Sequence, residues 1–228
     1  MSHATKTAAF FDFDETLIAD NSAKLWLKHL WRTDQIGPLK VARSLFWLLR
    51  YKLAVIDMND ISRFALKDLE GIDEQRLREE VHQWYREHVR PRFYTQAIEL
   101  VEHHRNLGHT LVLLTAASPY ISECVVADLK LHETLCTRIE VAEGLFTGRP
   151  VEPLCYGEGK VFWAEQLANK LQISLGQSYF YTDSFTDLPM LKQVGNPVAT
   201  NPDPRLRRFA TRHNITVLDF SPEVRSPA

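Results

Sequence analysis

Three acidic side chains cluster where the first apolar run of the chain ends. The run Ala8–Phe11 is followed by Asp12, Asp14 and Glu15. Like charges this close repel one another, and the end of a strand does not need them for stability. In an extended chain, residues two apart point to the same side. Asp12 and Asp14 could therefore share one reaction, with one carboxylate as nucleophile and the other as proton donor and acceptor.

Four later residues suit the chemistry of a phosphoryl group. Thr115 ends the run HTLVLLT, Lys160 begins a helical pattern, and Asp183 and Asp187 lie in YTDSFTDLPML. Clustered carboxylates favour a hard cation such as Mg²⁺, which binds a few carboxylate oxygens together with water and phosphate. A hydroxyl and an ammonium group suit the remaining phosphate oxygens. The set predicts a site for Mg²⁺ and a phosphoryl group.

Each of these four residues also has an ordinary structural interpretation. Asp183 could cap a helix, and Asp187 could complement the dipole of a first helical turn. Thr115 could be a strand threonine and Lys160 a solvated helix residue. Their shared position at the ends of predicted strands favours a functional site, because ligands bind at the carboxyl ends of strands in open α/β sheets.

The elements that must position these residues are short strands alternating with helices. This alternation predicts an α/β fold with a doubly wound parallel sheet. Runs rich in β-branched and aromatic residues predict strands at Ala8–Phe13, Thr110–Thr115, Tyr179–Tyr181, Pro197–Thr200 and Thr216–Leu218.

Helix signals lie between the predicted strands. Thr95 as a cap and Gly108 as a stop bound one helix, and Ser118-Pro119 begins the next. Lys160 opens a third helix and Asp203-Pro204 a last one. Glycines at turn positions within residues 139–151 predict a small β-hairpin.

Residues 20–90 break the alternation of strands and helices. They contain helical patterns at roughly 22–33, 38–55, 58–69 and 73–88, and no convincing strand. We therefore predict an all-helical cap domain, residues 20–90, inserted into a core domain formed by residues 1–19 and 91–228.

Composition excludes several other classes of protein. The chain has 228 residues, 45% of them hydrophobic, and a net charge of −2, which gives no reason to expect a nucleic-acid partner. Its three cysteines are far apart and suggest neither a disulfide framework nor a zinc site. No secretory signal or membrane span is visible, so we expect a cytoplasmic protein without a membrane partner.

The motifs together resemble those of the haloacid dehalogenase superfamily of phosphatases. FDFDETL, LLTAAS, Lys160 and YTDSFTDLPML stand in the family's order, and the helical insert resembles the cap of subfamily IB, the branch that contains phosphoserine phosphatase. The resemblance covers nearly the whole chain. It implies a Rossmann-like core, a helical cap over the substrate, Mg²⁺ as cofactor, and hydrolysis of a small phosphomonoester through an aspartyl phosphate.

The resemblance also implies a role for each motif residue. It makes Asp12 the nucleophile, Asp14 the general acid and base, and Thr115 and Lys160 the phosphate ligands. It assigns the metal to the side chains of Asp12 and Asp183 and the backbone carbonyl of Asp14, with Asp187 in support, directly or through water. Family members often carry Gly and Asn where this chain has Thr182 and Thr186, so the surroundings of the metal differ here.

Two other functions use the same phosphorylated aspartate. A phosphotransferase or mutase would pass the phosphoryl group to an acceptor other than water. A receiver-like signalling module would keep the phosphoaspartate for hours. The acid and base at Asp14 and the large insert argue against a receiver.

No motif in the sequence identifies the substrate. Phosphoserine phosphatases place a glutamate for the substrate ammonium nine residues after the nucleophile, where this chain has Asn21. Asp20 is adjacent and could take that role, so both residues are predicted to affect specificity. The oligomeric state is not predicted.

Three further features favour structural interpretations. His104 is predicted to face the core with a backbone partner, and Ser118 to cap a helix rather than bind phosphate. The basic stretch RLRRFATRH, residues 205–213, is predicted to be a solvated helix face. The basic segment 38–56 is predicted to be a cap helix, with a membrane-surface helix as the alternative.

Overall fold

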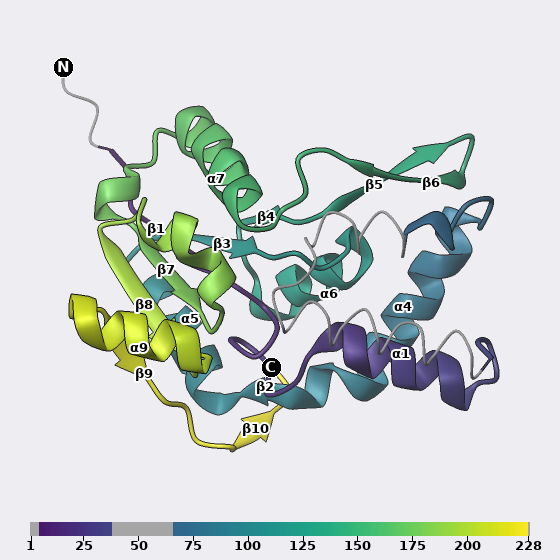
Figure 1. The fold of residues 1–228 in the computed structure, drawn as a ribbon, viewed down its shortest axis with the longest axis horizontal. Coiled ribbons are helices and arrows are strands. Elements are labelled where there is room, and N and C mark those ends of the chain that lie inside the picture. Colours follow the sequence, from purple (N-terminus) through teal and green to yellow (C-terminus); the bar gives the residue numbers. More distant parts are fainter. Residues whose placement is uncertain (1–4, 38–65, 228) are drawn as a thin grey trace.

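The structure, a computed structural model, describes residues 5–37 and 66–227. Its centre is a six-stranded parallel sheet (Figure 1) formed by β1 (Ala8–Phe11), β3 (Thr110–Leu114), β4 (Glu133–Leu135), β7 (Tyr179–Thr182), β8 (Asn196–Thr200) and β9 (Thr216–Leu218). The strand order is β4-β3-β1-β7-β8-β9, and every neighbouring pair is parallel. The predicted doubly wound parallel sheet is confirmed.

Helices cover both faces of this sheet, and alternate residues of β1 supply the two cores. Ala9 and Phe11 belong to one buried cluster and Ala8 and Phe10 to the other, because successive strand residues point to opposite faces. The first cluster includes side chains of α5 (Thr95–Asn106) and α6 (Pro119–Leu129). The second includes side chains of α7 (Glu158–Leu171), α8 (Leu188–Leu191) and α9 (Pro204–His213).

The chain changes direction across the sheet beside β1. From β1 it passes outward through β3 to β4, and it then returns to the other side of β1 to form β7, β8 and β9. The carboxyl ends of β1 and β7 therefore flank the switch point, which is the usual position of a ligand site in such a sheet. Asp12 and Asp183 follow these two strand ends.

Two helices of the insert lie within the described residues. They are α1 (Ser22–Arg32) and α4 (Glu74–His88), which match the patterns predicted at 22–33 and 73–88. Trp26 of α1 and Trp84 of α4 meet edge to face, with ring centroids 5.0 Å apart. The predicted pattern 38–55, the basic segment 38–56 and most of the pattern 58–69 lie outside the described residues.

The chain enters and leaves the insert through two segments that lie side by side. The Ala19 N–H donates to the Arg92 carbonyl at 2.9 Å, and the Tyr94 N–H donates to the Leu17 carbonyl at 3.0 Å. The proposed boundaries at 19/20 and 90/91 fall at this pairing. The division into a core domain and a cap domain 20–90 stays a prediction.

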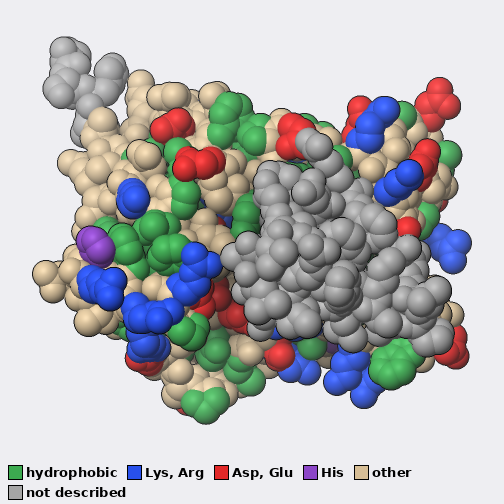
Figure 2. Space-filling view, viewed as in Figure 1, with side chains coloured by type: hydrophobic (Ala, Val, Ile, Leu, Met, Phe, Trp, Pro, Cys, Tyr) green, Lys and Arg blue, Asp and Glu red, His purple; other side chains and the backbone are tan. Residues whose placement is uncertain are grey.

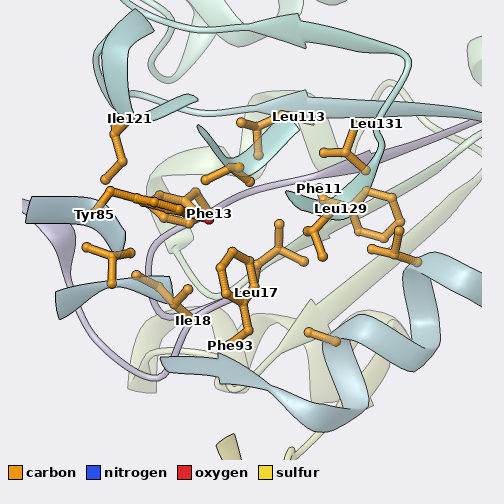
Figure 3. Packing of buried hydrophobic residues seen from close by; sticks show 14 of the residues in the cluster. Phe11, Phe13, Leu17, Ile18, Tyr85, Phe93, Leu113, Ile121, Leu129 and Leu131 are labelled. Atoms are coloured by element: carbon orange, nitrogen blue, oxygen red, sulfur yellow. The ribbon is translucent and has the colours of Figure 1, made fainter. Parts of the chain in front are cut away.

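Helix α4 packs against α6, one of the helices that cover the sheet. Arg78 donates two hydrogen bonds to the Glu123 carboxylate, at 2.6 and 2.7 Å, and the Tyr85 hydroxyl donates to Asp128 at 2.8 Å. Tyr85 and Ile121 also belong to one apolar cluster with Phe13, shown in Figure 3. These contacts hold α4 against α6.

The predicted hairpin is confirmed as β5 (Arg138–Ala142) and β6 (Leu145–Val151). The Gly71 N–H donates to the Phe146 carbonyl and the Glu74 N–H to the Gly144 carbonyl, both at 2.9 Å, so the hairpin is joined to the start of α4. Short elements not predicted are β4, the antiparallel pair β2 (Phe93–Tyr94) and β10 (Val224–Arg225), and the 3₁₀ turns η1 (Arg90–Arg92), η2 (Leu175–Gln177) and η3 (Phe185–Asp187).

Several local predictions need correction. Thr95 is the first helical residue of α5 rather than its cap. Helix α7 begins at Glu158, two residues before the predicted Lys160. His104 is buried as predicted, but its ring contacts side chains instead of the backbone: Nε2 lies 2.7 Å from the Tyr181 hydroxyl, and Nδ1 lies 2.8 Å from Nδ1 of His109.

Two expectations about helices agree with the structure. Gly108 ends its helix with a φ of 72°, a conformation that favours glycine. Ser118 occupies the cap position of α6, but its side chain makes no capping hydrogen bond. None of the helices in residues 5–37 and 66–227 is both long and apolar enough to cross a lipid bilayer.

Candidate active site

Asp12 is the first residue beyond β1, and the sheet holds its backbone. Its N–H donates to the Tyr181 carbonyl of the neighbouring strand at 2.9 Å, so the β1–β7 ladder continues through this residue. Its side chain is almost fully buried. Burial raises the pKa of the Asp12 carboxyl to about 7, while the nearby Lys160 acts to lower that pKa.

Lys160 is the buried cation of the site. It lies in the first turn of α7, and its Nζ is 3.0 Å from Asp12 Oδ1 and 2.7 Å from Asp187 Oδ2. Burial acts to lower the pKa of Lys160, but the two carboxylates outweigh burial and raise that pKa. Lys160 therefore stays charged and holds the orientation of Asp12. The solvated-helix interpretation of Lys160 is wrong, since the side chain is 2% exposed.

One carboxylate oxygen of Asp187 accepts hydrogen bonds from two donors. Its Oδ2 accepts from Lys160 and, at 2.7 Å, from the hydroxyl of Thr182 at the end of β7. The Thr182 Oγ1 in turn accepts from the Ser184 N–H at 3.2 Å. These contacts make Asp187 the residue that positions Lys160. Asp187 could bind a metal through its other carboxylate oxygen, Oδ1, or through a water molecule.

Asp183 lies on the other side of the switch point. Its side chain is buried, and the Thr16 hydroxyl lies 3.2 Å from its Oδ1 and donates to it. Burial raises the pKa of Asp183 well above the ordinary value, and the negative charges of Asp12 and Glu15 add to that effect. Two buried carboxylates that oppose each other's ionisation make a suitable pair for a cation.

The oxygen ligands at this site fit Mg²⁺ only if the ion needs few ligands from the protein. Within residues 5–37 and 66–227, no group of three or more His, Cys, Asp or Glu side chains is arranged to hold a metal ion. The two carboxylates of Asp12 and Asp183 with the backbone carbonyl of Asp14 are oxygen donors of the kind that Mg²⁺ accepts. Mg²⁺ keeps several waters and usually binds one or two carboxylates plus substrate phosphate, so this set fits it.

Asp14 points toward the insert. The first residue of α1, Ser22, donates to its carboxylate twice, from the backbone N–H to Oδ1 at 2.7 Å and from the hydroxyl to Oδ2 at 3.0 Å. Burial raises the pKa of Asp14 to about 6, although both hydrogen bonds from Ser22 act to lower it. An acid with this pKa can exchange a proton near neutral pH.

Thr115 lies at the same edge of the sheet. Strands β1 and β3 pair with Phe11 opposite Leu113, so Thr115 follows β3 at the level of the residues that follow β1. It is buried, and its hydroxyl accepts from the Ala117 N–H at 3.1 Å. The backbone N–H groups of this turn and the hydroxyl together suit phosphate oxygens.

The two predicted specificity residues already have partners. The Asp20 carboxylate forms an ion pair with Arg92, and the Asn21 side chain accepts from the Lys24 N–H at 3.1 Å as the cap of α1. Asn21 is thus a structural cap in this structure, and the charge of Asp20 is balanced by a neighbour.

Three site residues were not assigned a role from the sequence: Thr16, Ser22 and Thr182. Thr16 lies within the motif FDFDETL, which is the one signal that could have identified it. Ser22 and Thr182 carry no comparable signal, because their partners are defined by the tertiary structure.

Comparison with known proteins supports the same family. The model of the haloacid dehalogenase-like hydrolases matches residues 9–192. The "inhibition of morphological differentiation protein" of Streptomyces azureus is 33% identical over 96% of this chain and 80% of its own length. Phosphoserine phosphatase SerB1 of Mycobacterium tuberculosis is 32% identical over 93% of this chain and 70% of its own length.

A histidinol-phosphatase and a solved structure match the chain nearly end to end. The histidinol-phosphatase of Neisseria meningitidis is 28% identical over 94% of this chain and 99% of its own length. A crystal structure of a protein of unknown function from Bordetella pertussis Tohama I aligns with a TM-score of 0.86 at 30% identity, over 95% of this chain and 99% of that chain.

Proposed function

This chain belongs to the haloacid dehalogenase-like hydrolase family, and we propose that it is a Mg²⁺-dependent phosphatase that cleaves small phosphomonoesters through an aspartyl phosphate on Asp12. The observation that carries the proposal is the contact between Lys160 and Asp12 at the switch point of the sheet. A buried nucleophile oriented by a buried cation is the arrangement that attack on an anionic substrate requires.

In the first half of the reaction, Asp12 attacks the phosphorus atom. A new bond forms between the Asp12 carboxylate oxygen and phosphorus, and the bond between phosphorus and the leaving oxygen breaks. Asp14 gives its proton to that leaving oxygen, which departs as an alcohol. Thr115 and Lys160 bind the other phosphate oxygens and hold the group in line for attack.

In the second half, water replaces the leaving group. Asp14, now ionised, takes a proton from the water as it attacks phosphorus, and the bond between phosphorus and Asp12 breaks. Inorganic phosphate leaves, and Asp12 and Asp14 return to their starting states. A Mg²⁺ ion bound by Asp12, Asp183 and the Asp14 carbonyl would offset the repulsion between the anionic substrate and the nucleophile.

The contacts of Asp20 and Asn21 disfavour a substrate that depends on a carboxylate partner for an ammonium group. The Asp20 charge is balanced by Arg92, and Asn21 caps α1 with its side-chain oxygen, so neither supplies a carboxylate for a substrate ammonium group. Relatives of this chain carry the names phosphoserine phosphatase and histidinol-phosphatase. We therefore favour a substrate that is bulkier or less zwitterionic than phosphoserine, such as an amino-alcohol phosphate or a lipid-derived phosphate.

The test is phosphate release from a few dozen phosphomonoesters in the presence of Mg²⁺, with wild type and two variants. Asp12→Asn keeps the shape of the side chain and removes the nucleophilic charge, so it is expected to lose essentially all turnover. Asp34→Asn makes the same chemical change on the surface and is expected to retain full turnover. More than a few per cent of activity in Asp12→Asn would reject the mechanism.

The phosphotransferase and receiver alternatives are separated by the fate of the phosphoryl group. Mass spectrometry of acid-quenched wild type should show one phosphoryl group on Asp12 during turnover. Hydrolysis predicts that this species decays within seconds or less, whereas a signalling module would retain it for hours. A transferase would form a new phosphoester when alcohols are added.

A further inference from the structure

Helix α9 carries a basic face beside the loop that holds Asp183. Arg205, Arg208 and Arg212 are spaced three and four residues apart, so they lie on one side of the helix, and all three are exposed. Figure 2 shows Lys or Arg side chains gathered with apolar side chains and a histidine on this part of the surface. A hollow of about 290 Å³ is lined by Phe185, Arg205, Arg208, Phe209, Arg212 and His213.

The stability of the helix explains only part of this arrangement. Arg212 lies in the last turn, where the helix dipole favours positive charge. Arg205 and Arg208 lie in the first half of α9, where the dipole disfavours positive charge, although the cap Asp203 places one negative charge at the start of the helix and Arg208 donates to the Pro204 carbonyl at 3.0 Å. Arg208 and Arg212 are four residues apart, a spacing at which like charges destabilise a helix. Arg207, on another side of the helix, forms an ion pair with Asp219. An anion in the hollow would offset the repulsion.

The hollow also presents flat surfaces. The Arg205 guanidinium lies 4.5 Å from the centre of the Phe185 ring, and Phe185 meets Phe209 edge to face with centroids 6.1 Å apart. Phe209 stacks on His213 with centroids 3.9 Å apart and planes 19° apart. Aromatic rings and guanidinium planes of this kind favour a ligand with a flat ring of its own.

The size of the basic surface favours a small ligand over a polymer. The positive charges come from one helix of ten residues, while the chain as a whole carries a net charge of −2. Binding to a nucleic-acid backbone depends on several phosphate contacts along a basic surface, which one short helix does not offer. A hollow of about 290 Å³ lies just below the usual range of small-molecule sites, which begins at about 300 Å³, and so has room for a small ligand only.

We propose that this hollow binds a small phosphorylated molecule that carries an aromatic ring, a ligand of the nucleotide class. The three guanidinium groups would donate hydrogen bonds to the phosphate oxygens, which they bind with charge assistance. The ring of the ligand would stack on the aromatic and guanidinium planes. None of the residues that line the hollow is among those assigned to the site of Asp12, and the proposal does not depend on the proposed phosphatase activity.

The hollow is joined directly to the loop of the candidate active site. Asp203, the cap of α9, accepts from the Phe185 N–H at 2.7 Å, and its own N–H donates to the Asp183 carbonyl at 2.8 Å. It also accepts from the Arg205 N–H at 2.7 Å. Asp203 therefore links Phe185 and Arg205, which line the hollow, to the backbone of Asp183 in the candidate active site.

The experiment uses cyclic AMP as the probe, measured by isothermal titration calorimetry on the full chain. Cyclic AMP has a ring and a charged phosphate but no phosphomonoester, so a phosphomonoesterase cannot consume it. We expect saturable binding to wild type, at least tenfold weaker binding to the Arg205→Gln/Arg208→Gln/Arg212→Gln variant, and unchanged binding to Arg207→Gln as the control on the same helix. Asp12→Asn should bind like wild type.

Adenosine, which carries the ring of the probe without its phosphate, should bind at least tenfold more weakly than cyclic AMP. Equal binding of adenosine, equal binding by the triple variant, or no saturation by about 5 mM would overturn the proposal. Tighter binding of a single-stranded oligonucleotide than of cyclic AMP would also overturn it. If circular dichroism shows that the triple variant is unfolded, Arg212→Gln alone should weaken binding, and unchanged binding would count against the site.

Discussion

Ser22 and Asp14 connect the insert to the proposed proton donor. The first residue of α1 donates its backbone N–H to one oxygen of Asp14 at 2.7 Å and its hydroxyl to the other at 3.0 Å. The positive end of the helix dipole also faces this carboxylate. The position of α1 therefore affects the pKa of the group that, under the proposed function, transfers the proton.

Ser22→Ala should shift the pH profile. Both hydrogen bonds favour the ionised form of Asp14, so losing the hydroxyl raises the pKa of Asp14 above its present value of about 6. Asp14 must be protonated to act as the acid, so activity is lost as pH rises through that pKa. The alkaline limb of the kcat profile should therefore move upward, by about half a pH unit. Ser221→Ala, a surface change, should leave the limb unmoved, and an unmoved limb in Ser22→Ala would contradict this role.

Thr182→Val should weaken both the fold and turnover. The substitution removes the hydroxyl that donates to Asp187 and accepts from the Ser184 N–H, while it keeps the shape of the side chain. Leaving these buried groups unpaired should cost about 1–3 kcal/mol of unfolding free energy. Lys160 loses part of its support, so kcat should fall severalfold. Urea denaturation and steady-state kinetics measure the two effects.

Thr200→Val is the matched control for that prediction. Thr200 is also fully buried, but its hydroxyl has no hydrogen-bond partner among the described residues. Replacing it with an apolar group of the same shape should be neutral or slightly stabilising, with kcat unchanged. A loss of stability in Thr200→Val as large as that in Thr182→Val would show that the hydroxyl contacts are not the cause.

Metal removal should abolish activity, and the choice of metal should matter. A chelator should stop phosphate release, and excess Mg²⁺ should restore it. Ca²⁺ takes more ligands at longer distances and would misplace the nucleophile, so it should support little turnover. Asp183→Asn should require at least tenfold more Mg²⁺ for half-maximal activity. Full activity in excess chelator would reject the metal site.

His104 should make the fold sensitive to acid. Burial lowers the pKa of His104 to about 4, with His109 and His103 adding to the effect. Its ordinary pKa is about 6.5, so the unfolded chain binds a proton that the folded chain excludes. Stability is then fully present above pH 6.5 and is lost as pH falls toward 4, by up to about 3 kcal/mol.

The measurement is urea denaturation of wild type and His104→Gln between pH 4 and pH 7. Gln retains a group that can contact the Tyr181 hydroxyl but does not titrate, so the slope of stability against pH should be smaller in the variant. His103→Gln, in the exposed neighbour, should keep most of the wild-type slope. Identical slopes in wild type and His104→Gln would exclude His104 as the cause.

Phosphoserine should not be the preferred substrate. The contacts of Asp20 and Asn21 leave the insert's entry segment without a carboxylate for an ammonium group. A carboxylate 4 Å from an ammonium is worth up to about 4 kcal/mol at an effective dielectric near 20, before desolvation costs. The measurement is kcat/KM for phosphoserine beside histidinol phosphate, phosphocholine, glycerol phosphates and an aryl phosphate. A tenfold lead for phosphoserine would refute the prediction and would indicate that Asp20 leaves Arg92.

The fold class and the main site candidates could be predicted from the sequence because their signals are local. The apolar run before Asp12 predicted β1, and the alternation of strands and helices predicted the parallel sheet. The motif residues follow strand ends, and parallel strands bring those ends to one edge. Asp12, Thr115 and Asp183 thus lie at the same edge of the sheet in the structure, as their positions in the sequence indicated.

Only the tertiary structure determined which of these side chains contact one another. The Thr16 hydroxyl meets Asp183, 167 positions away, because β1 and β7 are neighbours in the sheet. Thr182 supports Asp187, and Arg92 balances Asp20, through contacts that leave no periodic pattern in the chain. Sequence periodicity reports the face on which a residue lies, whereas the partner of a buried polar group depends on strand order and on which helix packs above it.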